Sequence, residues 1–281
     1  MRCTSARGTD VRPGAGADLI RTAQALESGA PRAWAVSARI HHLAATTLSK
    51  IGESDLSWIA AERAMGAADQ ADDPLVLASA ARAGTHALLA IGRYDDALQL
   101  GRTAASWLNS HVADHDPEAL SLLGMLNLRM ATAAARHQDR PTRNDLLDQA
   151  RDAASDLGQD ANYWQTAFGP TNVLLHDLST ALDLGDVAYV IDHGPHINAA
   201  NMPVERQAAR QIDLARAYGY VAQDDDAITT LLRAERHAPQ LVHHSPSVRE
   251  TVHSIHRRTP VSNGGRASEF MRLAEQCRAI A

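Results

Sequence analysis

Apolar residues recur every three or four positions through most of this chain, the spacing that places them on one face of an α-helix. Five short turn motifs interrupt the pattern, and a second helical pattern follows each of them. Three of the five contain Gly, which ends helices because it adopts the left-handed conformation without steric cost. We therefore expect helical hairpins, each with a first helix A, a turn and a second helix B. The motifs are Ile51-Gly52-Glu53, Ile91-Gly92-Arg93-Tyr94, His137-Gln138-Asp139, Leu184-Gly185-Asp186 and Val221-Ala222-Gln223.

Small residues recur at two positions of helix B, five and twelve residues beyond the middle residue of each turn. Residues seven apart share a helix face, so small side chains at both positions would let helices A and B approach closely. Two of the five hairpins have Ala at both. The residues are Ser57, Ala97, Arg143, Val190 and Ala227 at the first position, and Ala64, Ala104, Ala150, Ile197 and Ala234 at the second.

Prolines mark the expected starts of helices. They stand at positions 31, 74, 117, 203 and 246, so every gap is 43 residues or twice 43. Pro suits the first turn of a helix, where its missing N–H has no intrahelical partner to lose. Asp73, Asp116 and Ser245 precede three of these prolines and are good N-cap residues. Asp160 occupies the one vacant place in the series.

Together these patterns predict helices and no strand. The expected helices cover residues 18–28, 32–51, 54–70, 74–91, 94–110, 117–137, 141–157, 170–184, 186–200, 203–221, 224–237, 246–258 and 268–280. We expect residues 1–17 to be a disordered lead-in, residues 18–258 to be a repeat domain, and residues 259–281 to be a loop and a C-terminal capping helix.

One hairpin resembles a known repeat. Gly92, Tyr94 and Ala97, with Ala104 beyond, resemble the turn of the tetratricopeptide repeat, and a later hairpin matches it at Ala227, Ala234 and Pro239. The period of 43 exceeds the roughly 34 residues usual for that repeat. The predicted fold is therefore an all-α, right-handed α-solenoid of degenerate tetratricopeptide-like hairpins. Such arrays present a concave surface to ligands and partners.

The array is irregular after Asp160. Gly169-Pro170 would end any helix begun at residue 160, so we expect helix A of this unit to begin at Pro170. Three aromatic residues, Tyr163, Trp164 and Phe168, cluster in the entering loop.

This break is the predicted ligand site, since a lapse in a regular array is where function is expected to override sequence rules. Asn172 and His176 share one helix face, and the next helix A carries a stripe of Arg206, Arg210 and Asp213. Arg grips carboxylates bidentately and Asn pairs with amides, so neighbouring A helices would form a wall for a carboxylate or peptide backbone. The candidate ligand-binding residues are Trp164, Thr166, Phe168, Asn172, His176, Arg206, Arg210 and Asp213.

A simpler interpretation competes with this one. Asn172 would satisfy the start of the helix, and Trp164 and Phe168 would fill the gap left by the broken repeat. Arg206 and Arg210 would then form a solvated face.

The composition narrows the function classes. Hydrophobic residues make up 45% of 281 residues and aromatic residues only 4%, which favours closely packed helices. The net charge of −6 argues against a large nucleic-acid surface. Cys3 and Cys277 form no disulfide framework, and neither a membrane-spanning run nor a signal-peptide core is present, so we expect a cytoplasmic location.

No catalytic signature is present, and we expect neither an enzyme nor a cofactor. With Lys50 the only lysine, a phosphate-binding P-loop is excluded. His193 and His196 form one histidine cluster, and Glu250, His253 and His256 share a helix stripe that could hold zinc or nickel. The histidines are scattered along the chain, however, so we expect no metal site.

Four sequence blocks are distinctive together. They are Asp55–Ala64, Trp164–His176, Met202–Arg206 and Leu231–Gln240. Over roughly residues 35 to 258 they resemble the C-terminal region of actinobacterial Xre-type (Cro/C1-like) transcriptional regulators. Members of that family carry an N-terminal helix-turn-helix domain, and no recognition-helix pattern precedes the repeats here. The resemblance therefore implies the sensory or dimerisation half of a regulator.

The expected function is a non-catalytic repeat domain that binds a peptide, a protein or a small signal molecule on its concave face and serves transcriptional regulation. A separate DNA-binding protein is an expected partner. One alternative is a protein–protein or homodimerisation scaffold with no small ligand. Another is direct DNA binding through Arg-rich helices, which the acidic net charge disfavours.

Overall fold

The computed structural model describes residues 15–27, 29–113, 115–258 and 265–280, and over these residues the chain is all-α, with helices in tandem and no strand. The predicted all-α solenoid is thus confirmed. The A helices are α2 (Pro31–Lys50), α4 (Pro74–Ala90), α6 (Pro117–Arg136), α8 (Pro170–Asp183) and α10 (Val204–Tyr220). The B helices are α3 (Ser54–Asp69), α5 (Tyr94–His111), α7 (Arg140–Leu157), α9 (Val187–His193) and α11 (Asp224–His237).

The five predicted turns share one hydrogen-bonding pattern. In each, the N–H three residues past the end of helix A bonds back to a carbonyl five residues earlier, as Glu53 does to Leu48 at 2.9 Å and Arg93 to Leu88 at 3.0 Å. This Schellman arrangement needs a left-handed residue just before that N–H. The left-handed residues are Gly52, Gly92, Gln138, Gly185 and Ala222, with φ between 58° and 85°.

Four of the five prolines in the 43-residue series begin a helix as expected, at residues 31, 74, 117 and 246. The Asp73 carboxylate accepts hydrogen bonds from the Leu75 and Val76 N–H groups at 2.9 and 3.3 Å. Asp116 caps α6 in the same way. Pro203 differs, because it lies one residue before α10 rather than in its first turn.

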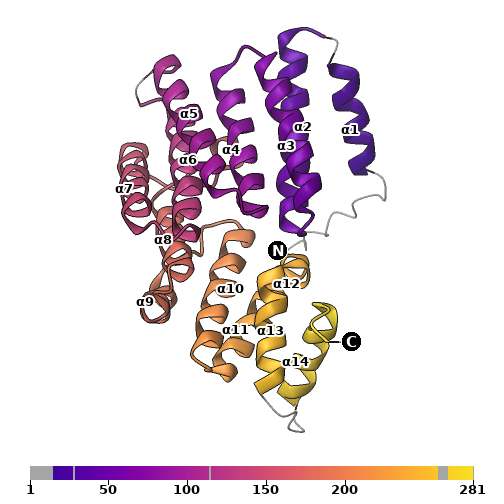
Figure 1. The fold of residues 1–281 in the computed structure, drawn as a ribbon, viewed down its shortest axis with the longest axis vertical. Helices are drawn as coiled ribbons and strands as arrows, with labels where there is room; N and C mark the ends of the chain where they lie inside the picture. The colour runs from indigo at the N-terminus through magenta and orange to yellow at the C-terminus, as the bar shows by residue number, and fades with distance from the viewer. Residues whose placement is uncertain (1–14, 28, 114, 259–264, 281) are drawn as a thin grey trace, which may run out of the picture.

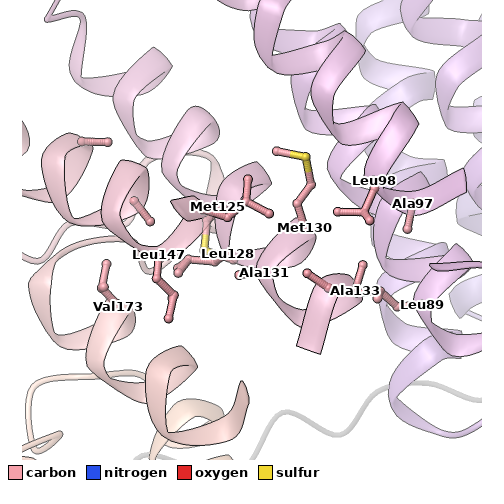
Figure 2. Close-up of a cluster of buried hydrophobic side chains, with 14 of the residues drawn as sticks. Leu89, Ala97, Leu98, Met125, Leu128, Met130, Ala131, Ala133, Leu147 and Val173 are labelled. Atoms are coloured by element: carbon pink, nitrogen blue, oxygen red, sulfur yellow. The ribbon is translucent and has the colours of Figure 1, made fainter. Parts of the chain in front are cut away.

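Small residues allow the close packing of each hairpin. Ala97, Ala150, Ala227 and Ala234 are fully buried between helices A and B, as the seven-residue spacing predicted. The buried side chains of neighbouring hairpins form hydrophobic clusters. Figure 2 shows one of them, in which side chains of α6 lie between those of α4 and α5 on one side and those of α7 and α8 on the other.

The A helices form the inner layer of a curved array. Each packs on the next, α2 on α4, α4 on α6, α6 on α8 and α8 on α10, whereas the B helices pack mainly on A helices. The curvature brings the two ends of the array together, with α12 (Pro239–His244) and α13 (Pro246–Arg258) near the end of α2 (Figure 1). A Cβ atom at Gly52 would lie 3.6 Å from Cγ of Pro246.

Several predicted boundaries were wrong. The helix expected over 186–200 stops at His193, because Gly194-Pro195 divert the chain into a short 3-10 turn, Gly194–His196. Helix α12 was not predicted, because Pro239 begins a new helix instead of only closing the repeat. No helix in the described part of the chain is long and apolar enough to cross a membrane.

The ends of the chain also differ from expectation. Residues 15–17 of the expected lead-in belong to α1 (Ala15–Leu26), and residues 265–267 of the expected loop belong to α14 (Gly265–Gln276). The remaining residues of both segments, 1–14 and 259–264, lie outside the described residues, as does Cys3.

Candidate functional site

A cavity of about 390 Å³ opens on the inner face of the array. Four A helices that are far apart in sequence line it together with the loop of the broken repeat. Its charged and titratable lining includes Lys50 and His42 of α2, Arg82 and His86 of α4, Arg129 of α6, and Glu205 and Arg206 of α10. The cavity therefore depends on the curvature of the whole array, since no single hairpin contains it.

The inserted loop (residues 160–169) is closed at its neck. The Ala161 N–H donates to the Phe168 carbonyl at 2.8 Å, and the Asp160 carboxylate accepts from the Thr171 N–H at 3.0 Å. Asp160 thus caps α8 although ten residues separate it from Pro170. Gly169 is needed at this neck, because a Cβ there would lie 2.5 Å from the Asp160 Cα.

Three non-glycine residues in the loop have a left-handed backbone. They are Trp164, Gln165 and Ala167, with φ of 52°, 53° and 49°. Such residues are costly and persist where surrounding contacts enforce them, which is common at ligand sites. Here the Asn162 carboxamide accepts from the Ala167 N–H at 2.9 Å, and the Thr166 hydroxyl donates to the Tyr163 carbonyl at 2.7 Å.

Aromatic side chains anchor this loop to the helices beneath it. Phe168 is fully buried against α6, where a Cβ at Gly124 would lie 1.9 Å from its ring. Trp164 donates its indole N–H to Glu118 at 2.5 Å, and the Arg39 guanidinium lies 5.2 Å from the centre of its ring. These contacts hold the polar part of the loop, Asn162 to Ala167, against the cavity.

Arg82 is oriented by a buried histidine. Its guanidinium lies 2.8 Å from Nε2 of His42, whose Nδ1 lies 2.9 Å from the Ser79 carbonyl oxygen. A guanidinium only donates, so Nε2 accepts and Nδ1 carries the proton that it donates to Ser79. The ring is therefore neutral. Burial, reinforced by the charge of Arg82, lowers the pKa of His42 to about 3.

Arg82, Arg129 and Arg206, which we call the arginine triad, lack acidic partners. Among the described residues, none of the three forms an ion pair. The Nε atoms of Arg82 and Arg129 are buried without a hydrogen-bond partner. Glu205 is the one carboxylate in the described cavity lining, and Lys50 Nζ holds it at 2.7 Å.

The environment of the triad disfavours positive charge. Burial, followed by the charge of Arg206, lowers the pKa of Arg82 to about 10. Burial also lowers the pKa of Arg129 well below its ordinary value, with the charges of Arg206 and Arg82 adding to the effect. The same causes keep the pKa of His86 well below its ordinary value, so its ring is neutral near pH 7.

The structure places six of the eight predicted site residues in three groups. Thr166 and Arg206 line the cavity. Trp164 and Phe168 anchor the loop, as the simpler interpretation of these aromatics proposed. Asn172 and His176 are buried: the Asn172 amide donates to the Thr166 carbonyl at 3.4 Å, and His176 Nδ1 lies 3.0 Å from the Asn172 carbonyl oxygen.

Arg210 and Asp213 do not extend the wall expected from the sequence. Arg210 donates to the carbonyls of Gly194 and Ile197 at 3.0 Å each, because α9 ends early and brings that segment under α10. Asp213 pairs with Arg216 at 3.1 Å. The single wall of Asn172, His176, Arg206 and Arg210 was therefore a wrong expectation, since only Arg206 of these four lines the cavity.

Sequence reasoning missed most of the cavity, although a signal was present. Leu43, His86 and Arg129 all line it, and they are separated by the same 43 residues as the prolines. They occupy one position of three successive A helices. Asn172 continues the series by number, but it is fully buried and donates to the Thr166 carbonyl of the inserted loop, so it does not line the cavity itself.

The helix stripe of Glu250, His253 and His256 was considered above as a zinc or nickel site and set aside. His253 Nδ1 lies 3.1 Å from the Ala279 carbonyl oxygen. Within the described ranges, no three His, Cys, Asp or Glu side chains are grouped so that they could hold a metal ion. Cys277 is buried in the C-terminal core, and burial raises the pKa of its thiol to about 11.

Comparison with known proteins supports the fold alone. No protein-family model and no curated protein matches the chain. Among solved structures, BtubC (BKLC) from P. vanneervenii is similar, with a TM-score of 0.53 and 13% sequence identity over 90% of this chain and 94% of that one. At this identity the similarity extends to the helical array and not to its ligands.

Proposed function

We propose that this chain is a non-catalytic repeat domain that binds a ligand on its inner face and serves transcriptional regulation in the cytoplasm. The observation that supports the binding role is the cavity, which is lined by three arginines without acidic partners, two of which have an Nε atom without a hydrogen-bond partner. Its volume of about 390 Å³ lies in the range of roughly 300 to 1,000 Å³ typical of small-molecule sites.

The regulatory role rests on the four sequence blocks that resemble Xre-type regulators. One of them, Trp164–His176, contains most of the inserted loop, and another, Met202–Arg206, supplies Arg206. Two of the blocks thus contribute to the cavity lining. In this proposal the repeat domain senses the ligand, and a helix-turn-helix protein or segment that it contacts binds the DNA.

A tryptophan at the cavity mouth tests the binding role. Leu43 lines the cavity and is 54% exposed, so Leu43→Trp would occupy ligand space without disturbing the core. Leu56→Trp is the matched control, since Leu56 is 51% exposed on α3 and does not line the cavity. After dialysis against a small-molecule extract, mass spectrometry should find a compound retained by the wild type and by Leu56→Trp but lost from Leu43→Trp.

The same variants test the regulatory role in the organism that encodes the chain. Deletion and Leu43→Trp should change the same set of transcripts, and Leu56→Trp should leave them at wild-type levels. Equal ligand retention by all three proteins would contradict the proposed cavity. A deletion that changes no transcripts would contradict the regulatory role.

A further inference from the structure

The arginine triad concentrates positive charge where the fold provides almost nothing to balance it. Arg82, Arg129 and Arg206 come from three different A helices and line one cavity. The carboxylate of Glu205 faces this cavity too, but Lys50 binds it at 2.7 Å and offsets its charge. The described lining therefore carries four cations against one anion.

This arrangement is costly in the ligand-free protein. A charge that is taken out of water without a partner is strongly destabilising, and like charges within one cavity add repulsion. Burial and mutual repulsion both lower the pKa of Arg129. Residues that destabilise a fold in this way are typical of binding sites, because the bound ligand supplies what the protein lacks.

One member of the triad, Arg82, is held in place before any ligand arrives. Arg82 is 6% exposed, and the neutral ring of His42 holds its guanidinium. The Nε atoms of Arg82 and Arg129 are buried without a hydrogen-bond partner in the protein, and guanidinium groups match the paired oxygens of phosphate and carboxylate. Three such groups from three helices suit a ligand with more than one anionic group.

We infer that the ligand of the cavity is a small molecule carrying at least two negative charges on phosphate or carboxylate groups, bound between Arg82, Arg129 and Arg206. This inference rests on the proposed binding function and specifies its chemistry. The cavity of about 390 Å³ sets the size limit, which admits a metabolite and excludes duplex DNA. His86, neutral in the same cavity, offers one further donor or acceptor to the uncharged part of the ligand.

Pyrophosphate and citrate are suitable probes, each measured against sodium chloride at matched ionic strength. Thermal unfolding and titration calorimetry would compare the wild type with Arg129→Gln and with the control Arg63→Gln, whose exposed site on α3 lies outside the cavity. At least one probe should raise the Tm of the wild type and of Arg63→Gln. A response to pyrophosphate alone identifies a phosphate ligand, and a response to citrate alone identifies a carboxylate ligand.

Arg129→Gln should give two opposite effects. Without a probe its Tm should exceed that of the wild type, because an unpaired buried charge is removed. With a probe its affinity should fall by about tenfold or more, as expected for a lost charge-assisted hydrogen bond. A merely structural arginine would instead lower the Tm when replaced.

Two results would overturn the inference. One is that neither probe raises the Tm of the wild type beyond the chloride control. The other is that Arg129→Gln lowers the Tm of the free protein and binds the probes as tightly as Arg63→Gln does. If a neutral compound is retained by the wild type and lost from Leu43→Trp while both probes fail, the charge inference is wrong and the binding function stands.

Discussion

At the scale of single residues, His42 shows how a buried ring sets the direction of a functional side chain. It accepts from Arg82 through one nitrogen and donates to the Ser79 carbonyl through the other. Protonation would remove the acceptor and place a second cation beside the guanidinium. The charges of Arg39 and Lys50 also oppose protonation. The neutral ring is therefore a condition for the arrangement of Arg82.

Acidification should destabilise the protein through this histidine. Burial and Arg82 lower its pKa from 6.5 to about 3 in the folded state, so between these values the unfolded chain binds the extra proton. The stabilisation is complete above pH 6.5 and declines below it, by about 2 kcal/mol at pH 5, given about 1.4 kcal/mol per pH unit.

The variant His42→Gln tests this prediction. The glutamine amide can accept from Arg82 and donate to Ser79, but it does not titrate in this pH range. The free energy of unfolding, measured with denaturant at pH 7 and pH 5, should fall by about 2 kcal/mol less in the variant than in the wild type. Parallel pH profiles for the two proteins would refute this account.

Some of these residue-scale features could be predicted from the sequence and others could not. The caps at Asp73 and Asp116 are local, because a cap and the N–H groups that it satisfies lie within three residues. The partners of His42 lie on another helix, 37 and 40 residues away. Only the packing of α2 on α4 determines that they meet, and periodicity does not specify the rotation of one helix on the next.

At the scale of elements, the inserted loop connects the regular and the irregular parts of the array. The turns and prolines were predictable because each depends on a short stretch of chain. The position of α8 was predictable as well, since Gly169-Pro170 forces its start. The path of the loop was not, because it depends on Phe168 reaching Gly124 of α6 and Trp164 reaching Glu118.

Asp160 should stabilise the start of α8 although it lies ten positions before that helix. Its carboxylate accepts from the Thr171 N–H at 3.0 Å, so Asp160→Ala would leave that donor without its cap. We expect a loss of about 1 kcal/mol in the free energy of unfolding, the usual effect of removing a capping side chain. Chemical denaturation would measure it. Asp160→Asn retains an accepting oxygen and should lose much less, and equal losses in both variants would argue against a capping role.

At the scale of the whole molecule, curvature creates the binding cavity. Its lining comes from α2 to α10, and the bridge between Lys50 and Glu205 spans the ends of that range. The sequence predicted an array with a concave face, because the repeats indicate stacking. It did not predict how far the array curves, which is set by the sum of small rotations between successive hairpins.

Direct DNA binding is not expected of this chain. The net charge is −6, and three of its arginines line a cavity of about 390 Å³ instead of forming an exposed basic surface. In an electrophoretic mobility assay at physiological salt, the protein should leave duplex DNA unretarded. A sequence-specific shift that survives excess competitor DNA would contradict this expectation and favour the DNA-binding alternative.

The closed neck of the inserted loop has a consequence for how such a protein can diversify. Its ends meet through the backbone hydrogen bond between Ala161 and Phe168, which requires no particular side chain at either residue. Trp164 and Phe168 anchor the loop, whereas residues 165–167 line the cavity. Related proteins can therefore acquire new selectivity by changing these three cavity-lining residues, without rebuilding a single repeat.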